Sequence, residues 1–321
     1  MELTFGPIPS RRLGRSLGIN NIPPKICSYA CVYCQLGNTL KMQNEREVFY
    51  KPEKIYSAVE KRIYQLESRG EGIDYLTFVP DGEPTLDLNL GKTIELLKKL
   101  GKKIAVITNS SLIYDENVRN DLREVDWISI KVDAVSENIW HKVDRPYGKI
   151  NYRNILNGIK IFADEYHGYL TTETLLIKSI NDIASEMKMT ADFINQLNPK
   201  VAYISVPTRP PAEEYAIPPD SEFVTETYQI FNSKIKNVEL IIGYEGDGFA
   251  STGNFEEDLL SITAVHPMRK EAIKKLMNKD DAKWEIVESL LKKQEIKKAE
   301  FSGNIFYYRN LKQIFKKIKN K

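Results

Sequence analysis

Three cysteines lie within eight residues, in the run Cys27-Ser28-Tyr29-Ala30-Cys31-Val32-Tyr33-Cys34, and the chain has no others. Thiolates at this Cys-x3-Cys-x2-Cys spacing can ligate three irons of a [4Fe-4S] cluster and leave the fourth iron open. An open iron can bind a substrate or cosubstrate, so such a cluster would take part in a reaction rather than only carry electrons. The spacing therefore predicts a catalytic iron–sulfur cluster on Cys27, Cys31 and Cys34.

Two other uses of clustered cysteines are weaker. Three cysteines and a distant histidine could form a zinc site, but none of His141, His167 and His266 stands at a finger-like spacing. Disulfides are disfavoured because an odd number of clustered cysteines, in a chain without a signal peptide, indicates a reducing compartment.

The cysteine spacing resembles the radical S-adenosylmethionine (SAM) superfamily, whose signature is Cys-x3-Cys-x-aromatic-Cys. Tyr33 supplies the aromatic residue, which in that family lies against the adenine of SAM. The stretch up to Gln35-Leu36-Gly37 is similar to a branch known only as iron–sulfur oxidoreductases, with the wybutosine-synthesis enzyme of tRNA as a more distant relative. The resemblance implies a [4Fe-4S] cluster and SAM as cofactors, and an electron donor such as ferredoxin or flavodoxin.

A second motif, Asp81-Gly82-Glu83-Pro84-Thr85, resembles the family's Gly-Gly-Glu, which accepts hydrogen bonds from the amine of SAM. Asp81 stands where the family has its first glycine, so we assign the role to the backbone of Gly82 and the carboxylate of Glu83. The alternative is an ordinary turn at the end of a strand.

Further candidates follow other predicted strands. By resemblance, Asn109 and Ser110 would contact the carboxylate or ribose of SAM, and Val206 and Pro207 would line the adenine pocket. No residue identifies the hydrogen to be abstracted, so the catalytic residues stay unknown. Three more strand-end residues have a solvated ion pair as their alternative: Lys131, Asp133 and Glu173.

The elements that must position these residues alternate between strand and helix. Such alternation predicts an α/β fold with a parallel sheet, and about six repeats fit the partial (β/α)6 barrel that the resemblance implies. In such a barrel functional groups gather at the carboxyl ends of the strands, where the candidates fall. The predicted strands are 75–79, 104–108, 127–132, 170–177, 201–206 and 239–242, and the predicted helices lie near 53–69, 90–100, 115–123, 151–165, 183–197 and 220–236.

Residues 1–24 contain many prolines and glycines, which preclude a helix and predict an irregular lead-in with turns. Arg11, Arg12 and Arg15 precede the cysteines closely. They could neutralise a phosphate or carboxylate of a substrate, or the carboxylate of SAM, or they could pair with acidic residues of the fold.

The chain divides into a barrel domain at 1–242, a glycine-rich linker or lid loop at 243–254, and a C-terminal domain at 255–321. In the C-terminal domain, the predicted helices 269–277 and 283–293 precede a hairpin around Ser302-Gly303-Asn304, an order that suggests a winged-helix-like domain. Residues 1–24 and 243–254 are the candidates for closing the barrel mouth, because radical chemistry requires that water be excluded.

Charge is distributed unevenly: residues 255–321 carry 16 Lys and Arg against 10 Asp and Glu, whereas residues 1–254 carry 30 against 34. The basic lysines have Phe306, Tyr307 and Tyr308 between them, a pattern that could grip phosphates and stack on bases. A protein or peptide partner, or a structural or dimerising role, are the alternatives. The lysines in question include Lys274, Lys275, Lys292, Lys293, Lys297, Lys298, Lys312, Lys316 and Lys317.

No apolar run approaches the length of a membrane span, and the first residues do not resemble a secretion signal. We therefore expect a cytoplasmic protein without a membrane partner. We interpret the chain as a radical SAM enzyme that forms a 5′-deoxyadenosyl radical and modifies a macromolecule, with tRNA or another RNA favoured. The alternatives are the same chemistry on a protein, peptide or small metabolite, and an iron–sulfur DNA-binding sensor without turnover.

Overall fold

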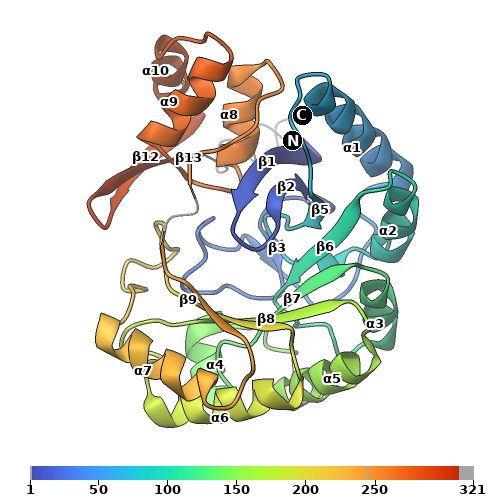
Figure 1. Ribbon diagram of the computed structural model, residues 1–321, viewed down its shortest axis with the longest axis vertical. Helices are drawn as coiled ribbons and strands as arrows, with labels where there is room; N and C mark the ends of the chain where they lie inside the picture. The colour runs from blue at the N-terminus through green and yellow to red at the C-terminus, as the bar shows by residue number, and fades with distance from the viewer. Residues whose placement is uncertain (1, 244–245, 311–321) are drawn as a thin grey trace.

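The computed structural model describes residues 2–243 and 246–310 of the chain. Its largest sheet has eight strands in the order β1-β2-β5-β6-β7-β8-β9-β10. Strands β2 to β10 run parallel to their neighbours, and β1 is antiparallel to β2. The sheet curls into an open half-barrel (Figure 1). The strands are β1 (Thr4–Ser10), β2 (Gly14–Ile19), β5 (Tyr75–Phe78), β6 (Lys103–Thr108), β7 (Trp127–Lys131), β8 (Tyr169–Leu175), β9 (Val201–Ser205) and β10 (Val238–Ile241).

Helices cover the outer face of this sheet (Figure 1). The predicted apolar stripe of α1 is confirmed, since Ile55, Val59, Ile63 and Leu66 are all buried. Strands β5 to β10 match the six predicted strands, so the partial barrel is confirmed. The covering helices are α1 (Pro52–Glu67), α2 (Leu90–Lys98), α3 (Glu116–Arg123), α5 (Tyr152–Glu165), α6 (Ala184–Gln196) and α7 (Ser221–Asn232).

Helix α4 (Glu137–Asp144) was not predicted. Its two turns bury only Ile139, Trp140 and Val143 among apolar residues, and so few positions do not establish a helical period. Three short elements complete the barrel domain: β3 (Ile26–Cys27) pairs with β4 (Lys41–Met42) beside the first cysteine, and a 3-10 turn, η1, spans Pro84–Leu86.

The prediction of an irregular lead-in is wrong, because β1 and β2 form a hairpin that extends the sheet. Pro7 and Pro9 are tolerated because β1 is an edge strand. A proline lacks the backbone N–H, and on the open side of an edge strand no neighbouring strand needs that donor. Gly6, with φ of 85°, lies where the pairing register shifts between Phe5 and Ile8. Irregular composition here marks a bulged edge strand rather than a loop.

The C-terminal unit, by which we mean residues 249–310, has its own apolar core. The predicted hairpin is present as β12 and β13, and the strand order of its small sheet is β11-β13-β12. Its elements are α8 (Phe255–Thr263), β11 (Met268–Arg269), α9 (Lys270–Lys279), α10 (Glu285–Lys292), β12 (Ile296–Phe301) and β13 (Asn304–Arg309). Among the described residues no helix is long and apolar enough to cross a membrane.

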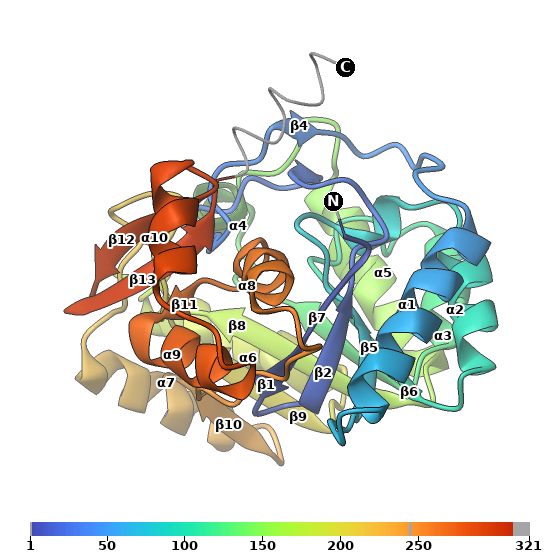
Figure 2. The same ribbon diagram turned by 90° about the horizontal axis from the view of Figure 1, so that it is seen from above.

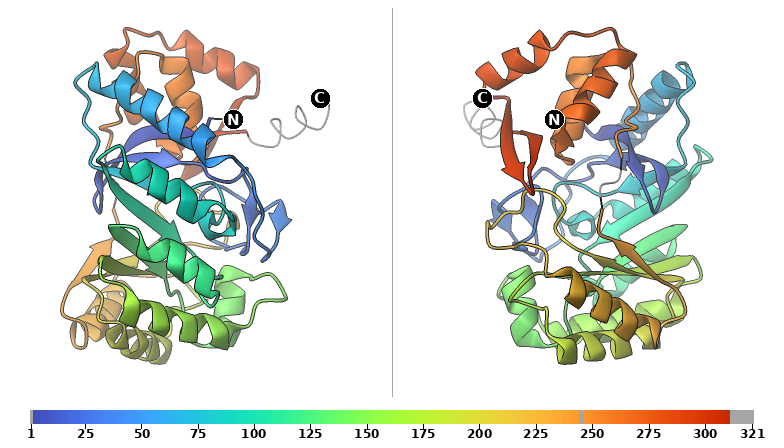
Figure 3. Two further views of the ribbon diagram at one scale, coloured as in Figure 1. Left: turned by 90° about the vertical axis from the view of Figure 1, so that its right-hand side faces the viewer. Right: turned by 60° about the vertical axis from the view of Figure 1, so that its left-hand side comes forward.

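The C-terminal unit packs against the beginning of the barrel. Helix α8 lies along β1 (Figures 2 and 3), and Ile8 of β1 packs against the core of the unit. A buried ion pair joins Arg62 of α1 to Asp258 of α8 at 2.7 Å. Removing one partner of such a pair is costly because the other charge stays buried, so the unit is held firmly on the barrel.

The described residues of the predicted linker or lid, 243 and 246–254, contain no helix or strand. Phe249 and Ala250 are nevertheless buried, and the Ala250 N–H donates to the carbonyl of Pro7 at 3.2 Å. Residues 244–245 lie outside the described portion of the chain, as do the basic residues Lys312, Lys316 and Lys317.

Candidate active site

A cavity of about 360 Å³ lies inside the half-barrel, within the size range of small-molecule sites. All three cysteines line it, together with residues of the β1–β2 hairpin and two residues of the C-terminal unit, Val265 and His266. Of the residues predicted to bind SAM, five line the cavity: Tyr33, Gly82, Glu83, Asn109 and Val206. Ser110 is buried and is not among the lining residues.

Backbone hydrogen bonds to the C-terminal end of α4 hold the cysteine loop in place. The Ala30 and Val32 N–H groups donate to the carbonyls of Asp144 (3.1 Å) and Val143 (2.9 Å). Arg145 donates from Nε to the carbonyl of Ala30 at 2.7 Å, and it adopts the left-handed conformation with φ of 44°. A non-glycine residue in this conformation is uncommon and persists where contacts fix it. The loop that presents the cysteines is therefore positioned by backbone contacts.

The three cysteines are free thiols in a buried setting. Burial raises the pKa of Cys27 to about 12, and it also raises the pKa values of Cys31 and Cys34, although Lys25 opposes the rise at Cys34. Buried thiolates need positive charge beside them, and bound iron supplies it while displacing the protons. The donor set of three free thiols, presented by one loop to one cavity, thus fits an iron–sulfur cluster.

A single metal ion fits less well. Within residues 2–243 and 246–310 no three His, Cys, Asp or Glu side chains are grouped to hold one ion. In a cluster each cysteine binds a separate iron, so its ligands need not converge on one point. The histidine at the cavity, His266, contacts Arg209 through Nε2 at 3.0 Å.

The second motif contacts the chain just before Cys27 through Gly82. Gly82 pairs with Ile26 as an isolated parallel bridge, and its φ is 152°. A Cβ at Gly82 would lie 2.0 Å from the carbonyl oxygen of Ile26. Glycine is needed here because only it permits this backbone approach.

Glu83 is buried and accepts four hydrogen bonds from the protein. Its Oε1 accepts from the Thr85 N–H (3.1 Å), the Thr85 hydroxyl (2.6 Å) and the Thr108 hydroxyl (2.6 Å). Its Oε2 accepts from the N–H of Asn109 at 2.8 Å. The carboxylate therefore ties the end of β5 to the end of β6, and its role toward the amine of SAM stays a prediction.

Asn109 stands beside the first cysteine. Its Nδ2 donates to the Ser28 hydroxyl at 2.9 Å and lies 3.6 Å from the sulfur of Cys27. Hydrogen bonds to cluster-ligating sulfurs help to set reduction potentials. The position predicted to contact SAM thus also touches the predicted cluster ligand.

Asp81 forms a buried ion pair with Lys25, 3.0 Å apart. Burial raises the pKa of Asp81 to about 6, against the opposing effect of Lys25. Sequence reasoning noted Asp81 only as a departure from the family pattern and missed Lys25. The one available signal was the place of Lys25 two residues before Cys27.

Comparison with known proteins agrees with this geometry. Residues 21–194 match the Radical SAM superfamily. The UPF0026 protein of Methanocaldococcus jannaschii is 48% identical over 322 residues, covering 100% of both chains. The chain belongs to the radical SAM superfamily.

Solved structures show the same fold. A radical SAM methyltransferase from Sphaerobacter thermophilus has a TM-score of 0.55 at 14% identity, covering 71% of this chain and 66% of that one. TYW1 with a lysine–pyruvate adduct bound has a TM-score of 0.51 at 16% identity, covering 69% and 74%. Membership of the radical SAM superfamily implies SAM cleavage at an iron–sulfur cluster.

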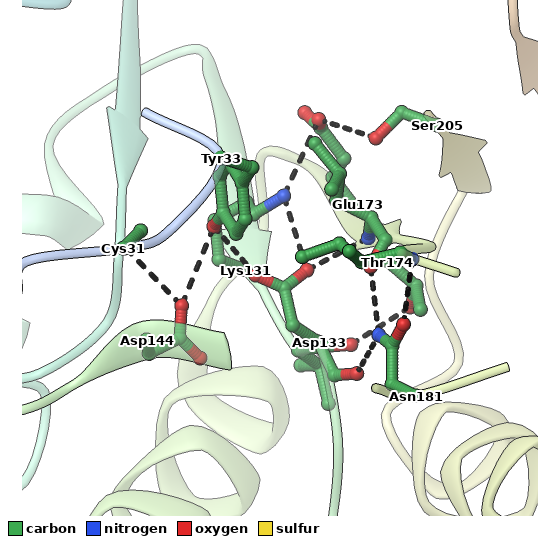
Figure 4. Close-up of polar contacts among 12 residues, drawn as sticks. Cys31, Tyr33, Lys131, Asp133, Asp144, Glu173, Thr174, Asn181 and Ser205 are labelled. Carbon is green, nitrogen blue, oxygen red and sulfur yellow. Dashed lines mark hydrogen bonds and ion pairs between the residues drawn. The ribbon is translucent and has the colours of Figure 1, made fainter. Parts of the chain in front are cut away.

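In this radical SAM protein the predicted adenine-facing residue, Tyr33, belongs to a buried polar network (Figure 4). Its hydroxyl donates to Asp133 at 2.6 Å, and Lys131 lies 5.0 Å from the centre of its ring. Lys131 also pairs with Asp133 at 3.1 Å and Glu173 at 3.4 Å. The expected ion pairs exist, but they are buried rather than solvated, and they fix the orientation of Tyr33.

Glu173 connects this network to the β1–β2 hairpin, because it also pairs with Arg12. Burial alone would raise the pKa of Glu173, but Lys131 and Arg12 overcome that effect and lower it to about 2. Arg15 pairs with the exposed Asp74 at 3.1 Å, and Arg11 donates to the carbonyl of Gly243. Arg12 and Arg15 therefore pair with acidic residues of the fold, the second of the two roles expected for these arginines.

Arg209 joins the radical SAM barrel to the C-terminal unit at the cavity. It donates to the Gln35 side chain at 2.8 Å and contacts Nε2 of His266 at 3.0 Å. Burial and the neighbouring guanidinium lower the pKa of His266 well below its usual range, so Nε2 is a neutral acceptor. Sequence reasoning noted Gln35 only as part of the stretch that carries the resemblance and His266 only as a weak zinc candidate, so it did not find this contact.

Proposed function

We propose that this protein binds a [4Fe-4S] cluster on Cys27, Cys31 and Cys34 and modifies a macromolecule, with tRNA or another RNA as the favoured substrate. The observation that carries the proposal is the convergence of three free cysteines on one cavity that also holds Tyr33, Gly82 and Asn109. A cytoplasmic protein with ferredoxin or flavodoxin as its electron donor fits this chemistry.

A cluster held by Cys27, Cys31 and Cys34 would supply the electron that cleaves bound SAM to methionine and a 5′-deoxyadenosyl radical, the species that would abstract hydrogen from the substrate. The protein's own residues bind and shield the reactants. Tyr33, held by Asp133, would present its ring toward adenine, and Val206, which also lines the cavity, would add an apolar contact. Leu13 of the β1–β2 hairpin and Val265 and His266 of the C-terminal unit line the cavity, and they would limit the contact of bound reactants with water.

Support for a nucleic-acid substrate comes from the C-terminal unit. Its order of helix, short strand, two helices and hairpin favours a winged-helix-like domain. The predicted phosphate-binding lysines that the structure describes are all exposed and could neutralise phosphates: Lys274, Lys275, Lys292, Lys293, Lys297 and Lys298. The expected base stacking needs a correction, because Phe306 and Tyr307 are buried and only Tyr308 is half-exposed.

One observation favours the second candidate, the same chemistry on a small metabolite or a peptide. The cavity has a volume of about 360 Å³, and the C-terminal unit contributes Val265 and His266 to its lining, so the reacting group must enter a space of small-molecule size. A macromolecule would meet this demand only by inserting a single nucleotide or side chain.

The test is an anaerobic assay of the reconstituted, reduced protein with SAM, in which 5′-deoxyadenosine is measured with and without total tRNA. We expect a large tRNA-dependent rise that is lost in Lys297→Glu/Lys298→Glu and kept in Lys188→Glu, an exposed lysine on α6. Slow cleavage that tRNA does not change would favour the small substrate. An intact cluster without any deoxyadenosine would contradict an enzyme and favour the DNA-binding sensor.

A further inference from the structure

Three exposed cations, which we call the basic rim, follow one another along the chain beside the cysteine loop. They are Lys142 in the last turn of α4, Lys149 in the loop after it and Arg153 in the first turn of α5. We propose that the basic rim docks an acidic ferredoxin, which passes one electron across the cysteine loop to the cluster. The inference rests on the proposed function, which requires an electron donor but leaves open where that donor binds.

The first support is how little of the chain separates the cysteine loop from the surface beside the basic rim. Pro146 and Tyr147 are only half-buried. The Tyr147 N–H donates to the carbonyl of Ser28 at 2.9 Å, and Pro146 forms an antiparallel bridge with Tyr29. Figure 2 shows this loop between α4 and α5, in green, beside β4. Because Ser28 directly follows Cys27, a partner seated here lies one layer of backbone away from a predicted cluster ligand.

The second support is that the charge of the basic rim is not compensated. None of the three cations forms an ion pair with any residue that the structure describes. The only acid between residues 138 and 154 is Asp144, and its side chain is buried. Arg145, in the same stretch, shows the contrast, because it pairs with Glu213 at 2.6 Å. The basic rim therefore presents net positive charge to the solvent, which attracts an acidic partner from a distance.

The third support comes from the other flank of the cysteine loop. Residues 35–44 contain no acid, and Leu40 among them is 55% exposed. The hydroxyl of its neighbour Thr39 donates to the carbonyl of Tyr29 at 2.7 Å, so Leu40 and the basic rim lie on either side of Tyr29. Electron-transfer complexes have small interfaces, in which an apolar contact is surrounded by polar residues. Leu40 supplies that apolar contact.

Charge complementarity selects a ferredoxin as the occupant. Ferredoxins are small acidic proteins that carry one electron at low potential, about −400 mV in the plant type. In the transfer the reduced ferredoxin loses one electron and the cluster gains it, and no bond forms or breaks. Complementary charge chiefly speeds the encounter and fixes its orientation, as a short-lived complex requires. A nucleic acid would be attracted by the same charge, so the experiment must separate the two.

The experiment uses Lys149→Glu/Arg153→Glu, which reverses two charges of the basic rim, in cluster-loaded protein under anaerobic conditions. Its control is Lys61→Glu/Lys188→Glu, the same change of charge at two exposed lysines of α1 and α6. Biolayer interferometry measures the Kd for oxidised ferredoxin. Formation of 5′-deoxyadenosine from SAM is measured with reduced ferredoxin and, separately, with dithionite, a small reductant that needs no docking site. Iron content is measured in parallel.

We expect the Kd for ferredoxin to rise about 10-fold or more in the rim variant and by less than about twofold in the control. With ferredoxin below its Kd, deoxyadenosine formation should fall by the same factor. Formation with dithionite and the iron content should stay at the wild-type level. Raising the NaCl concentration should weaken ferredoxin binding more in the wild type than in the rim variant, because salt screens exposed charges.

Four results would overturn the proposal. An equal loss with both reductants would show that the substituted residues support the cluster. Unchanged ferredoxin binding in the rim variant would place the donor elsewhere. Total tRNA that binds the wild type and not the rim variant, with ferredoxin binding unchanged, would make the basic rim an RNA surface. Binding of flavodoxin but not of ferredoxin would refute the choice of carrier.

Two further measurements separate the possible failures. If the rim variant loses iron, Lys149→Ala/Arg153→Ala replaces it, and this variant should show a smaller loss of ferredoxin affinity in the same direction. If the wild type forms no deoxyadenosine with either reductant, the proposed function fails. Interferometry with the rim variant and its control still decides whether ferredoxin docks at the basic rim.

Discussion

Two walls of the cavity are built in different ways. The cysteine wall consists of Cys27, Cys31 and Cys34 with Gly82, Glu83 and Asn109, and it is fixed by backbone hydrogen bonds and a close backbone approach. The C-terminal wall consists of Val265 and His266, and Arg209 of the barrel connects it to Gln35 beside the cysteines. The cysteine wall is thus fixed by backbone contacts, whereas the contacts that join the C-terminal wall to the cysteine loop are made by side chains.

The largest effect should come from the cysteine wall itself. In Cys34→Ser we expect iron content and deoxyadenosine formation to fall to background, because two remaining thiolates hold a cluster poorly. Iron analysis and the absorbance of the cluster would check this. Retention of a full iron load by the variant would refute the assignment of Cys34.

A smaller but substantial loss of stability is expected from Glu173→Gln. This substitution removes the charge that pairs both with Lys131, beside Tyr33, and with Arg12 of the β1–β2 hairpin. Lys131 and Arg12 would lose a buried partner, so the free energy of unfolding should fall by about 3 kcal/mol at pH 7. Urea unfolding would measure it. Glu165→Gln, which breaks an exposed pair with Arg123, is the control and should cost less than about 1 kcal/mol.

The difference in unfolding free energy between the wild type and Glu173→Gln should depend on pH. The folded-state pKa of Glu173 is about 2, below its ordinary value of 4.5, so its contribution is fully present above pH 4.5 and is lost as pH falls through 2. The stability gap between wild type and Glu173→Gln should therefore narrow from pH 5 to pH 3. A gap that widens on acidification would contradict the pairing.

Arg209→Ala tests whether the cysteine wall depends on its connection to the C-terminal wall. It removes the contacts with Gln35 and His266, and we expect a loss of about 1.5 kcal/mol in unfolding free energy with an unchanged iron content. The variant should also form more deoxyadenosine without modifying substrate, because the cavity is less well covered. Loss of the cluster would show that the C-terminal wall also supports the cysteine wall.

The smallest effect is expected at the periphery. Arg15→Ala breaks an ion pair that water reaches on both sides, and such pairs contribute little. Melting temperature, iron content and deoxyadenosine formation should all match the wild type. A clear loss of SAM affinity would show that Arg15 reaches the ligand after all.

The sequence was sufficient for the barrel and the cysteines because both depend on local pattern. Six apolar runs separated by amphipathic helices predict parallel strands without knowledge of partners, and Cys27, Cys31 and Cys34 are close together in the chain. The β1 strand was missed because a strand can contain prolines only where it lies at the edge of a sheet. Whether a strand lies at the edge is known only once the whole sheet is assembled.

The charged contacts of the site could not be predicted in the same way. Glu173 meets Arg12 from 161 residues away, and Asp144 of the unpredicted α4 lies 3.2 Å from the sulfur of Cys31. Sequence reasoning identified polar residues at strand ends, but their pairing follows from the curvature of the sheet. The four hydrogen bonds to Glu83 and the ion pair of Asp81 with Lys25 depend on distances that no motif encodes.

The contact between α8 and β1 has a consequence for how the chain folds. Arg62 finds Asp258 across 196 residues, and Pro7 receives the N–H of Ala250. Contacts of such long sequence separation form slowly, because a long loop must first be closed. During synthesis the first strand and its edge stay exposed until the residues of α8 have left the ribosome. The β1 edge of the sheet is therefore among the last regions of the barrel to be completed.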